Sequence, residues 1–268
     1  MHLHFLDPYQ PRLSPIHALD ARLKFVLTLA FILTVSLTPA GAWPVYILLL
    51  AFVISAEILS DLGIGYVQKR ALLALPFVLA AVPVIFTLKG QPLFSLSPGG
   101  WTLTASVEGL ERFVSVALKS WLSIQAAVVL AAVTPFPDLL QAMRAVGIPR
   151  LLVAMFGLMW RYLFVLADEA LRLMRARAAR SAWGTEAGRR SGGNVAWRAR
   201  VTGGMAGGLF LRAFERSDRI YVAMLSRGYD GEVNTLPLPP FSGVSWFLLI
   251  AGLVFLGLLL ILGYAFWG

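Results

Sequence analysis

The segment Val244–Trp267 has the sequence VSWFLLIAGLVFLGLLLILGYAFW, and none of its side chains is charged. A helix needs about 20 mostly apolar residues to cross the hydrocarbon core of a bilayer. The segment ends with Tyr264, Phe266 and Trp267, and aromatic rings of this kind are enriched where a membrane meets water. Val244–Trp267 therefore predicts a transmembrane helix.

Four further apolar segments come near the same length. They are Leu23–Thr38, Trp43–Ser60, Ala71–Leu88 and Phe113–Thr134. The third of these holds Pro76 and Pro83, and a proline removes a helix hydrogen bond, so a kinked helix is expected there. We therefore predict an all-α membrane protein with about five transmembrane helices.

The composition of the whole chain agrees with a membrane protein. Of its 268 residues, 58% are hydrophobic and only 14% are charged, whereas a soluble domain usually carries about 25% charged residues. The net charge is +9, but the basic residues alternate with long apolar segments, which favours cytoplasmic loops over nucleic-acid binding. No cysteine is present, which excludes disulfides and thiol catalysis.

The arginine distribution predicts which parts of the chain face the cytoplasm. Residues 141–240 hold 15 Arg and no Lys, against 7 Asp and Glu. Basic residues concentrate in the cytoplasmic loops of membrane proteins. We therefore expect a cytoplasmic N-terminus and an N-terminal membrane bundle with four spans over residues 1–134. A cytoplasmic coupling-helix region over 135–243 and a last span over 244–268, ending outside, complete the expected order.

One segment allows an alternative topology. Leu151–Ala167 is apolar apart from Arg161 and could form a sixth span. That topology would place the following 12 Arg, from Arg172 to Arg227, outside. An Arg in the middle of a span also costs several kcal/mol, about 3 on insertion scales. We therefore favour a helix that lies at or under the membrane surface.

Two long helices and one short helix are expected in the cytoplasmic region. The long ones cover about Arg150–Ser181 and Val201–Arg227, and a loop rich in Gly, Arg and Ser lies between them at Gly184–Ala199. Gly228 follows the second long helix, and glycine is the favoured residue just past a helix end. The short helix is expected at Phe136–Val146.

A small-Arg-small motif ends each long helix. Ala179-Arg180-Ser181 ends the first, and Ser226-Arg227-Gly228 ends the second. Taken alone, each Arg is explained by solvation and by the helix dipole, which favours a cation at a C-terminus. As a pair in a lysine-free region, they favour docking, because small neighbours admit a partner's backbone and the guanidinium fork binds carboxylates and carbonyls.

The second long helix contains a cluster of glycines. The cluster consists of Gly203, Gly204, Gly207 and Gly208. Glycines three and four residues apart share a helix face and permit two helices to cross closely. We interpret the cluster as a tight crossing between the two long helices, with a flexible helix start as the alternative, because glycine disfavours helix.

Three titratable residues were weighed as functional candidates. His2 and His4 lie near the N-terminus and could bind a metal, although a pair of surface histidines is the simpler interpretation. Glu57 lies inside the second predicted span, where an acidic residue is often functional. It could instead reach the interface or pair with Lys69 or Arg70. We predict no metal site.

The sequence contains no recognisable catalytic arrangement. Asp168 and Glu169 are followed by Arg172, a spacing that predicts an ion pair on a helix surface. No Ser/His/Asp set, metal-ligand spacing or Gly-rich phosphate loop is found along the sequence. We therefore predict a non-enzymatic protein that binds no cofactor and depends on partner subunits for ATP.

The order of several motifs carries a family resemblance. They are Ser14–Lys24 before the first span, Trp160–Phe164 and Asp168-Glu169 on the first long helix, Arg177–Ser181 at its end, and Ala223–Tyr229 ending the second. In this order, over nearly the whole chain, they resemble the transmembrane T component of energy-coupling-factor (ECF) uptake transporters. Within that group they resemble the cobalt-transport permease (CbiQ-like) branch.

The resemblance implies a membrane helix bundle with cytoplasmic coupling helices in a bacterial or archaeal cytoplasmic membrane. It implies that Arg180 and Arg227 dock into grooves on two ATP-binding-cassette ATPases, and that a separate membrane subunit (S) binds the substrate. ATP hydrolysis would then move the coupling helices and reorient that subunit. The first motif often ends in Gly in this family, whereas this chain has Ser181.

The function expected from this resemblance is a coupling subunit for cobalt or nickel uptake, with a vitamin as the alternative substrate. Two other functional classes fit the sequence less well. A stand-alone solute permease would leave the arginine-tipped helices without a role. An intramembrane enzyme would need polar groups within the spans, which offer little besides Glu57.

Overall fold

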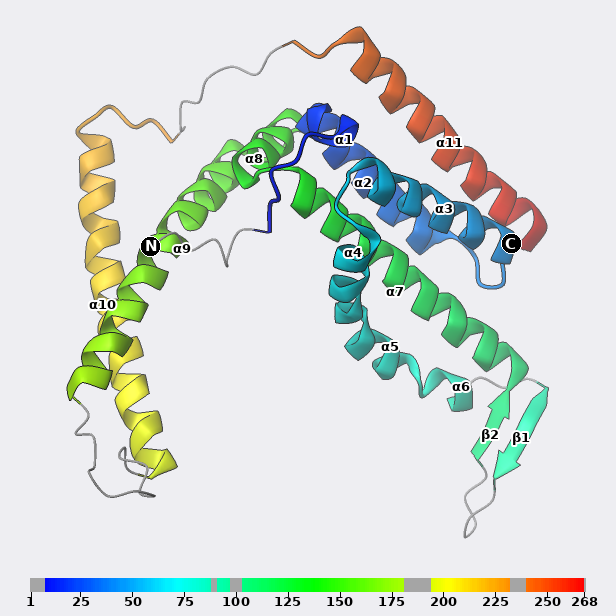
Figure 1. The fold of residues 1–268 in the computed structure, drawn as a ribbon, viewed down its shortest axis with the longest axis horizontal. Coiled ribbons are helices and arrows are strands. Elements are labelled where there is room, and N and C mark those ends of the chain that lie inside the picture. Colours follow the sequence, from blue (N-terminus) through cyan, green and yellow to red (C-terminus); the bar gives the residue numbers. More distant parts are fainter. Residues whose placement is uncertain (1–7, 88–90, 97–102, 181–193, 232–239, 268) are drawn as a thin grey trace. The chain divides into compact units, whose positions relative to one another are not determined.

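The computed structural model describes residues 8–87, 91–96, 103–180, 194–231 and 240–267 (Figure 1). Helices make up most of these residues. The expected all-α membrane fold is thereby confirmed, with the addition of one small β-hairpin that the sequence did not predict. The chain divides into two compact units, each of which is described by itself.

The bundle unit comprises Pro8–Gly147 together with the C-terminal segment from Leu238. Its long helices are α2 (Ala21–Leu37), α3 (Trp43–Leu59), α7 (Val107–Val133) and α11 (Gly243–Trp267). The short helix α8 (Phe136–Ala145) packs against α2. The short helix that the sequence grouped with the coupling region therefore belongs to the bundle's compact unit.

The third predicted span is an interrupted helix, as its two prolines indicated. Its pieces are α4 (Ile64–Ala71), η1 (Leu72–Ala74), α5 (Leu75–Ala81) and α6 (Val84–Thr87). It begins before the predicted Ala71, because Gly63 starts α4 with a φ of +80°. All four pieces pack along α7. Leu88, the predicted last residue, lies outside the described residues.

A β-hairpin precedes α7. Its strands β1 (Pro92–Leu96) and β2 (Leu103–Ser106) pair antiparallel. Ser106 then caps α7 by accepting the Gly109 N–H at 3.1 Å, so this helix starts at Val107 rather than at the predicted Phe113. Gly109 is needed for packing, since a Cβ there would lie 2.6 Å from the carbonyl oxygen of Ile85.

Apolar side chains fill the space between α2, α3, α7 and α11. The core of this bundle includes Phe31, Val35, Leu49, Val53, Leu122, Leu256 and Leu259. Other large apolar side chains on α11 point outward, and Phe247 and Ile261 are 71% and 63% exposed. A helix that is apolar all round is typical of a membrane span, because lipid covers its outer face.

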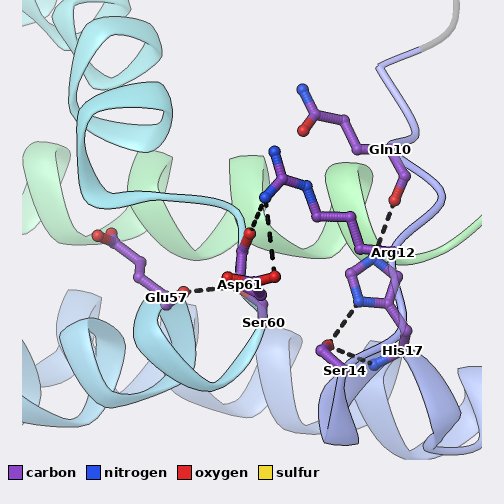
Figure 2. A network of polar contacts seen from close by, with 7 residues as sticks. All are labelled: Gln10, Arg12, Ser14, His17, Glu57, Ser60 and Asp61. Atoms are coloured by element: carbon purple, nitrogen blue, oxygen red, sulfur yellow. Dashed lines mark hydrogen bonds and ion pairs between the residues drawn. The ribbon is translucent and has the colours of Figure 1, made fainter.

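The residues from Pro8 to Leu19 form an N-terminal strap that covers one end of the bundle (Figure 2). The Gln10 N–H donates to the Ala132 carbonyl of α7 at 3.0 Å. Arg12 donates to the Asp61 carbonyl beyond α3. His17, in α1 (Pro15–Ala18), lies 2.7 Å through Nδ1 from the Ser14 hydroxyl and 3.0 Å through Nε2 from the Gln10 carbonyl. The strap thereby joins the ends of α3 and α7.

Lys24 strengthens the same end of the bundle. Its side chain is 9% exposed, and its Nζ donates to the buried Val133 carbonyl in the last turn of α7 at 3.1 Å. The C-terminal carbonyls of a helix have no partners within the helix and carry its negative dipole end. Lys24 therefore satisfies a helix end that would otherwise be left buried without a donor.

The membrane-spanning potential of the helices is clear from their length. Among the described residues, the helical stretches that are long and apolar enough to cross a membrane are Ile64–Thr87, Val107–Val133, Arg150–Arg180 and Gly243–Trp267. The chain is therefore a multi-pass membrane protein. Because Arg150–Arg180 meets the same criterion, its placement at the membrane surface stays a proposal that depends on the arginine distribution.

The hairpin unit contains two 31-residue helices, α9 (Arg150–Arg180) and α10 (Val195–Leu225). The predicted start of α10 at Val201 was wrong. The helix begins at Val195, inside the segment predicted as a loop, with Asn194 before its first turn. The glycines at 203, 204, 207 and 208 do not interrupt the helix, because helix on both sides outweighs their low propensity.

Candidate functional site: an arginine-tipped helical hairpin

Polar contacts show that α9 and α10 run antiparallel. Late in α9, Arg177 Nη1 donates to the Thr202 hydroxyl, early in α10, at 3.1 Å. Nearer the middle of α9, the Glu169 carboxylate accepts from Arg216 at 2.8 Å and from Arg212 at 3.5 Å. Residues that come later in α9 thus meet residues that come earlier in α10.

Glu169 lies where the two helices meet. Its side chain is 18% exposed and belongs to the polar second half of α9. The hydrogen bond from Arg216 lowers the pKa of Glu169 below its usual range, so the carboxylate is charged at neutral pH. A charge-assisted pair of this kind is shorter and stronger than a neutral hydrogen bond. Sequence reasoning missed this contact.

The ion pair predicted within α9 is present beside it. Arg172 Nη2 lies 2.6 Å from Asp168 Oδ2, and the two residues are four apart on the helix. Glu169, the next residue, points to the other helix instead. Adjacent residues on a helix project about 100° apart. The carboxylate of Asp168 therefore pairs within α9, whereas that of Glu169 reaches α10.

The first small-Arg-small motif ends α9. Arg180 is the last residue of the helix, and both Ala179 and Arg180 are exposed. The third residue of the motif, Ser181, lies outside the described residues. An Arg at this position faces the unpaired carbonyls of the last turn and is favoured by the helix dipole. The guanidinium is therefore presented at the tip of the helix.

The second small-Arg-small motif ends α10 in a well-defined turn. Gly228 has a φ of +78°, the left-handed conformation that glycine adopts without strain. The Tyr229 N–H donates to the Met224 carbonyl and the Gly228 N–H to the Leu225 carbonyl, both at 3.0 Å. These two bonds define a Schellman cap, so the predicted glycine cap is present. Arg227, just before the glycine, is exposed.

The antiparallel pairing separates the two motifs. Arg180 lies at the end of the hairpin where α9 finishes, and Arg227 at the end where α10 finishes. Each lies 11 residues beyond the Glu169–Arg216 contact along its own helix. At 1.5 Å per residue, the two arginines are therefore roughly 30 Å apart along the hairpin. That distance permits two separate contacts with partner proteins.

A groove that is lined in part by Tyr162 lies between α9 and α10. It has a volume of about 460 Å³, and its lining includes Leu158, Tyr162, Leu166, Ile220, Tyr221 and Met224. Apolar side chains of both helices thus line a groove beside the Glu169 ion pair. Phe210 and Phe214 on α10 are instead 68% and 61% exposed, and they leave an apolar surface uncovered.

The glycine cluster does not form the predicted close crossing with α9 in this structure. A Cβ built at any of its four positions would meet nothing within 4 Å. The ion pairs between the helices are made instead by Glu169, Arg212 and Arg216. Glycine spacing makes a close approach possible at those positions. In the structure, however, α9 is bound by charged residues further along α10.

Glu57 in α3 is the buried titratable residue that the sequence had flagged. Its side chain is fully buried, and within the described part of the chain neither carboxylate oxygen has a hydrogen-bond partner. Figure 2 shows this side chain pointing away from the strap. The suggested pairing with Arg70 is absent, since that guanidinium lies over the Tyr66 ring at 4.4 Å.

No cluster of three or more His, Cys, Asp or Glu residues suited to a metal occurs among the described residues. His2 and His4 lie outside them. His17 is engaged by hydrogen bonds to Ser14 and Gln10. The exposed arginine tips are therefore the strongest candidate for a functional site in the part of the chain that the structure describes.

Comparisons of this chain with a family model and with known proteins agree on one family. Residues 13–237 match the family model described as cobalt transport protein, CbiQ. The chain is 30% identical over 238 residues to the energy-coupling factor transporter transmembrane protein EcfT of Thermosediminibacter oceani, with 85% of each chain covered. The EcfT protein of Lactococcus lactis subsp. cremoris is 28% identical over 233 residues, with 83% of each covered.

A further relative is a fusion. It is a putative fused cobalt transport protein, CbiMQ, of Methanocorpusculum labreanum, 27% identical over 253 residues that cover 89% of this chain and 39% of the fusion. The family model covers most of the chain, including both long helices of the hairpin and the whole second motif. The chain therefore belongs to the CbiQ family of ECF transporter transmembrane (T) components.

Proposed function

We propose that this chain couples ATP hydrolysis on two ATP-binding-cassette ATPases to substrate movement by a separate membrane subunit. The observation that carries the proposal is the pair of exposed arginines, Arg180 and Arg227, at opposite ends of one antiparallel hairpin. One hairpin with an exposed arginine at each end suits a pair of similar ATPases with one groove each. The family membership of the chain supports this assignment.

Electrostatics make the arginines suitable for docking. A guanidinium offers five donors in a planar fork, which can bind a carboxylate or several carbonyls at once. Small residues flank each arginine, so a groove can close around the side chain and exclude water. Truncating one member of a desolvated charged pair at an interface costs about 2–5 kcal/mol, whereas an exposed pair is worth under about 1 kcal/mol.

The experiment is co-purification of the ATPases with variants of this chain. We expect Arg180→Glu and Arg227→Glu each to weaken ATPase association by roughly 30-fold or more, and the double variant to abolish both association and uptake. Arg219→Glu is the matched control, because Arg219 is also exposed on α10 but lies outside both motifs. That control should change association less than about fivefold.

The result separates docking from simple solvation. If Arg180→Glu and Arg227→Glu keep the ATPases as well as Arg219→Glu does, the docking proposal is wrong. Insertion of the bundle should be unaffected in every variant, because the substitutions lie outside the bundle unit. Membrane expression of this chain, measured beside co-purification, verifies that point.

For the substrate, we infer cobalt or nickel, with a vitamin as the alternative. The family description names cobalt transport, as does the name of the fused relative, whereas the EcfT names carry no substrate. Selectivity belongs to the separate substrate-binding subunit in this proposal. Uptake of radiolabelled Co²⁺ by cells that express the complete transporter, with and without this chain, tests the cation assignment.

A further inference from the structure

Ion pairs between α9 and α10 are made by three charged residues, which we call the clasp: Glu169, Arg212 and Arg216. The carboxylate of Glu169 accepts from Arg216 Nη2 at 2.8 Å and from Arg212 Nη1 at 3.5 Å. The two arginines are four residues apart and so lie on one face of α10. Each arginine engages a different oxygen of Glu169. The pair of contacts therefore defines both the position of α10 along α9 and the distance between the two helices.

The clasp lies midway between the two docking arginines. Eleven residues separate Glu169 from Arg180, and eleven separate Arg216 from Arg227. Eleven residues of α-helix make about three turns and about 16 Å, so each docking arginine returns to the face of its helix that carries the clasp residue. Since the helices run antiparallel, the two tips extend from the clasp by equal lengths in opposite directions.

We propose that Glu169 is a positioning residue that fixes the crossing of α9 and α10, so that Arg180 and Arg227 reach two ATPase grooves at the same time. This inference rests on the proposed docking function. A slip of one helical turn at the crossing would change the separation of Arg180 and Arg227 along the hairpin by about 5 Å. Each motif would remain intact, but the two could no longer fit a pair of grooves whose spacing is fixed.

Other contacts along the hairpin are less able to set this register. Arg177 donates to the Thr202 hydroxyl at 3.1 Å, but this acceptor is neutral and lacks the opposite charge that strengthens the Glu169 pair. The groove that Tyr162 lines is mainly apolar, and apolar contacts tolerate small shifts because they have no direction. The clasp combines opposite charges with a defined bonding geometry near the centre of the hairpin.

The test is a charge reversal across the helix contact. An Arg212→Ala background removes the longer of the two contacts and leaves the single pair of Glu169 and Arg216. Glu169→Arg and Arg216→Glu are then made singly and together in this background. Asp168→Arg is the matched control, because Asp168 is the adjacent acidic residue and its partner Arg172 lies within α9.

Two measurements follow the hairpin and its function. Spin labels at Ala178→Cys and Ala223→Cys, both exposed positions just inside the motifs, report the distance between the tips in the otherwise cysteine-free full-length chain in nanodiscs. Co-purification of both ATPases and the ratio of uptake to ATP hydrolysis report coupling in the assembled transporter. A role in local stability alone would not change that ratio.

We expect each single reversal to broaden the distance distribution and to lower the uptake-to-hydrolysis ratio about tenfold. The combined reversal should restore both, because it recreates the pair with opposite polarity. Asp168→Arg should leave both measurements unchanged. Unchanged distances in the single reversals, or a combined reversal no better than they are, would overturn the proposal.

Failure of this inference is distinguishable from failure of the docking proposal. If Arg180→Glu releases the ATPases while the clasp variants behave like the parent chain, docking stands and the role of Glu169 is refuted. If the clasp variants alter the tip distance while Arg180→Glu and Arg227→Glu keep the ATPases, the docking function is refuted instead. Because this inference rests on docking, the role assigned to Glu169 then fails with it.

Discussion

At the scale of a single residue, Gly228 determines how α10 ends and where Arg227 points. Gly228 has a φ of +78° and open space around it. A side chain at this position would therefore strain the backbone without clashing with a neighbour. We expect Gly228→Ala to destabilise the Schellman cap by roughly 1–2 kcal/mol. Because the preceding Arg227 would lose its fixed position, retention of the ATPases in co-purification should fall as well.

Gly208→Ala is the control for this prediction. Gly208 also faces open space, but it lies in the interior of α10, where alanine is favoured over glycine by about 1 kcal/mol. Circular dichroism should therefore show equal or higher helicity in Gly208→Ala, with ATPase retention unchanged. Equal behaviour of the two variants would contradict the role assigned to the left-handed cap.

At the scale of elements, Lys24 links the start of α2 to the end of α7. We expect Lys24→Met to cost about 1–3 kcal/mol, because the buried Val133 carbonyl would lose its donor without gaining water. Thermal unfolding of the purified chain in detergent should show a lower midpoint. Lys69→Met removes the same chemical group from an exposed position and should stay within about 0.5 kcal/mol of the parent; equal losses would refute the prediction.

Sequence patterns predicted a structural feature correctly where one residue restricts the backbone at its own position. Proline positions predicted the interruption of the third span, which was expected at Ala71–Leu88 and is observed within Ile64–Thr87, and Gly228 predicted the end of α10, because each restricts its own backbone. Glu169 could not be assigned in this way. Its neighbour Arg172 suggested contacts within one helix, whereas its partners lie 43 and 47 residues along the chain, and only the folded hairpin brings them together.

The starts of α7 and α10 were predicted less well than their ends. Ser106 caps α7, but its side chain resembles any other loop serine in the sequence, and the β-hairpin before it has no strong alternating pattern. For α10, the Gly-, Arg- and Ser-rich composition of the segment predicted as a loop concealed a helix that begins at Val195. Of the proposed docking site, the sequence indicated both arginines, but their separation along an antiparallel hairpin required the structure.

At the scale of the whole molecule, topology is the property to test. We expect the N-terminus and the hairpin unit to face the cytoplasm and the end of α11 to face out, because the arginines of residues 141–240 would then all lie inside. In cells, a membrane-impermeant thiol reagent should label Phe266→Cys from outside but not Val195→Cys. External labelling of Val195→Cys, an exposed position, would reverse the assignment.

The absence of lysine from residues 141–240 has a practical consequence. The chain holds only Lys24, Lys69, Lys89 and Lys119, all in its first half. Reagents that acylate primary amines can therefore attach a dye, a surface or a cross-linker along that half while α9 and α10 stay unmodified. An immobilised chain prepared by amine coupling would keep its arginine tips chemically intact for binding measurements.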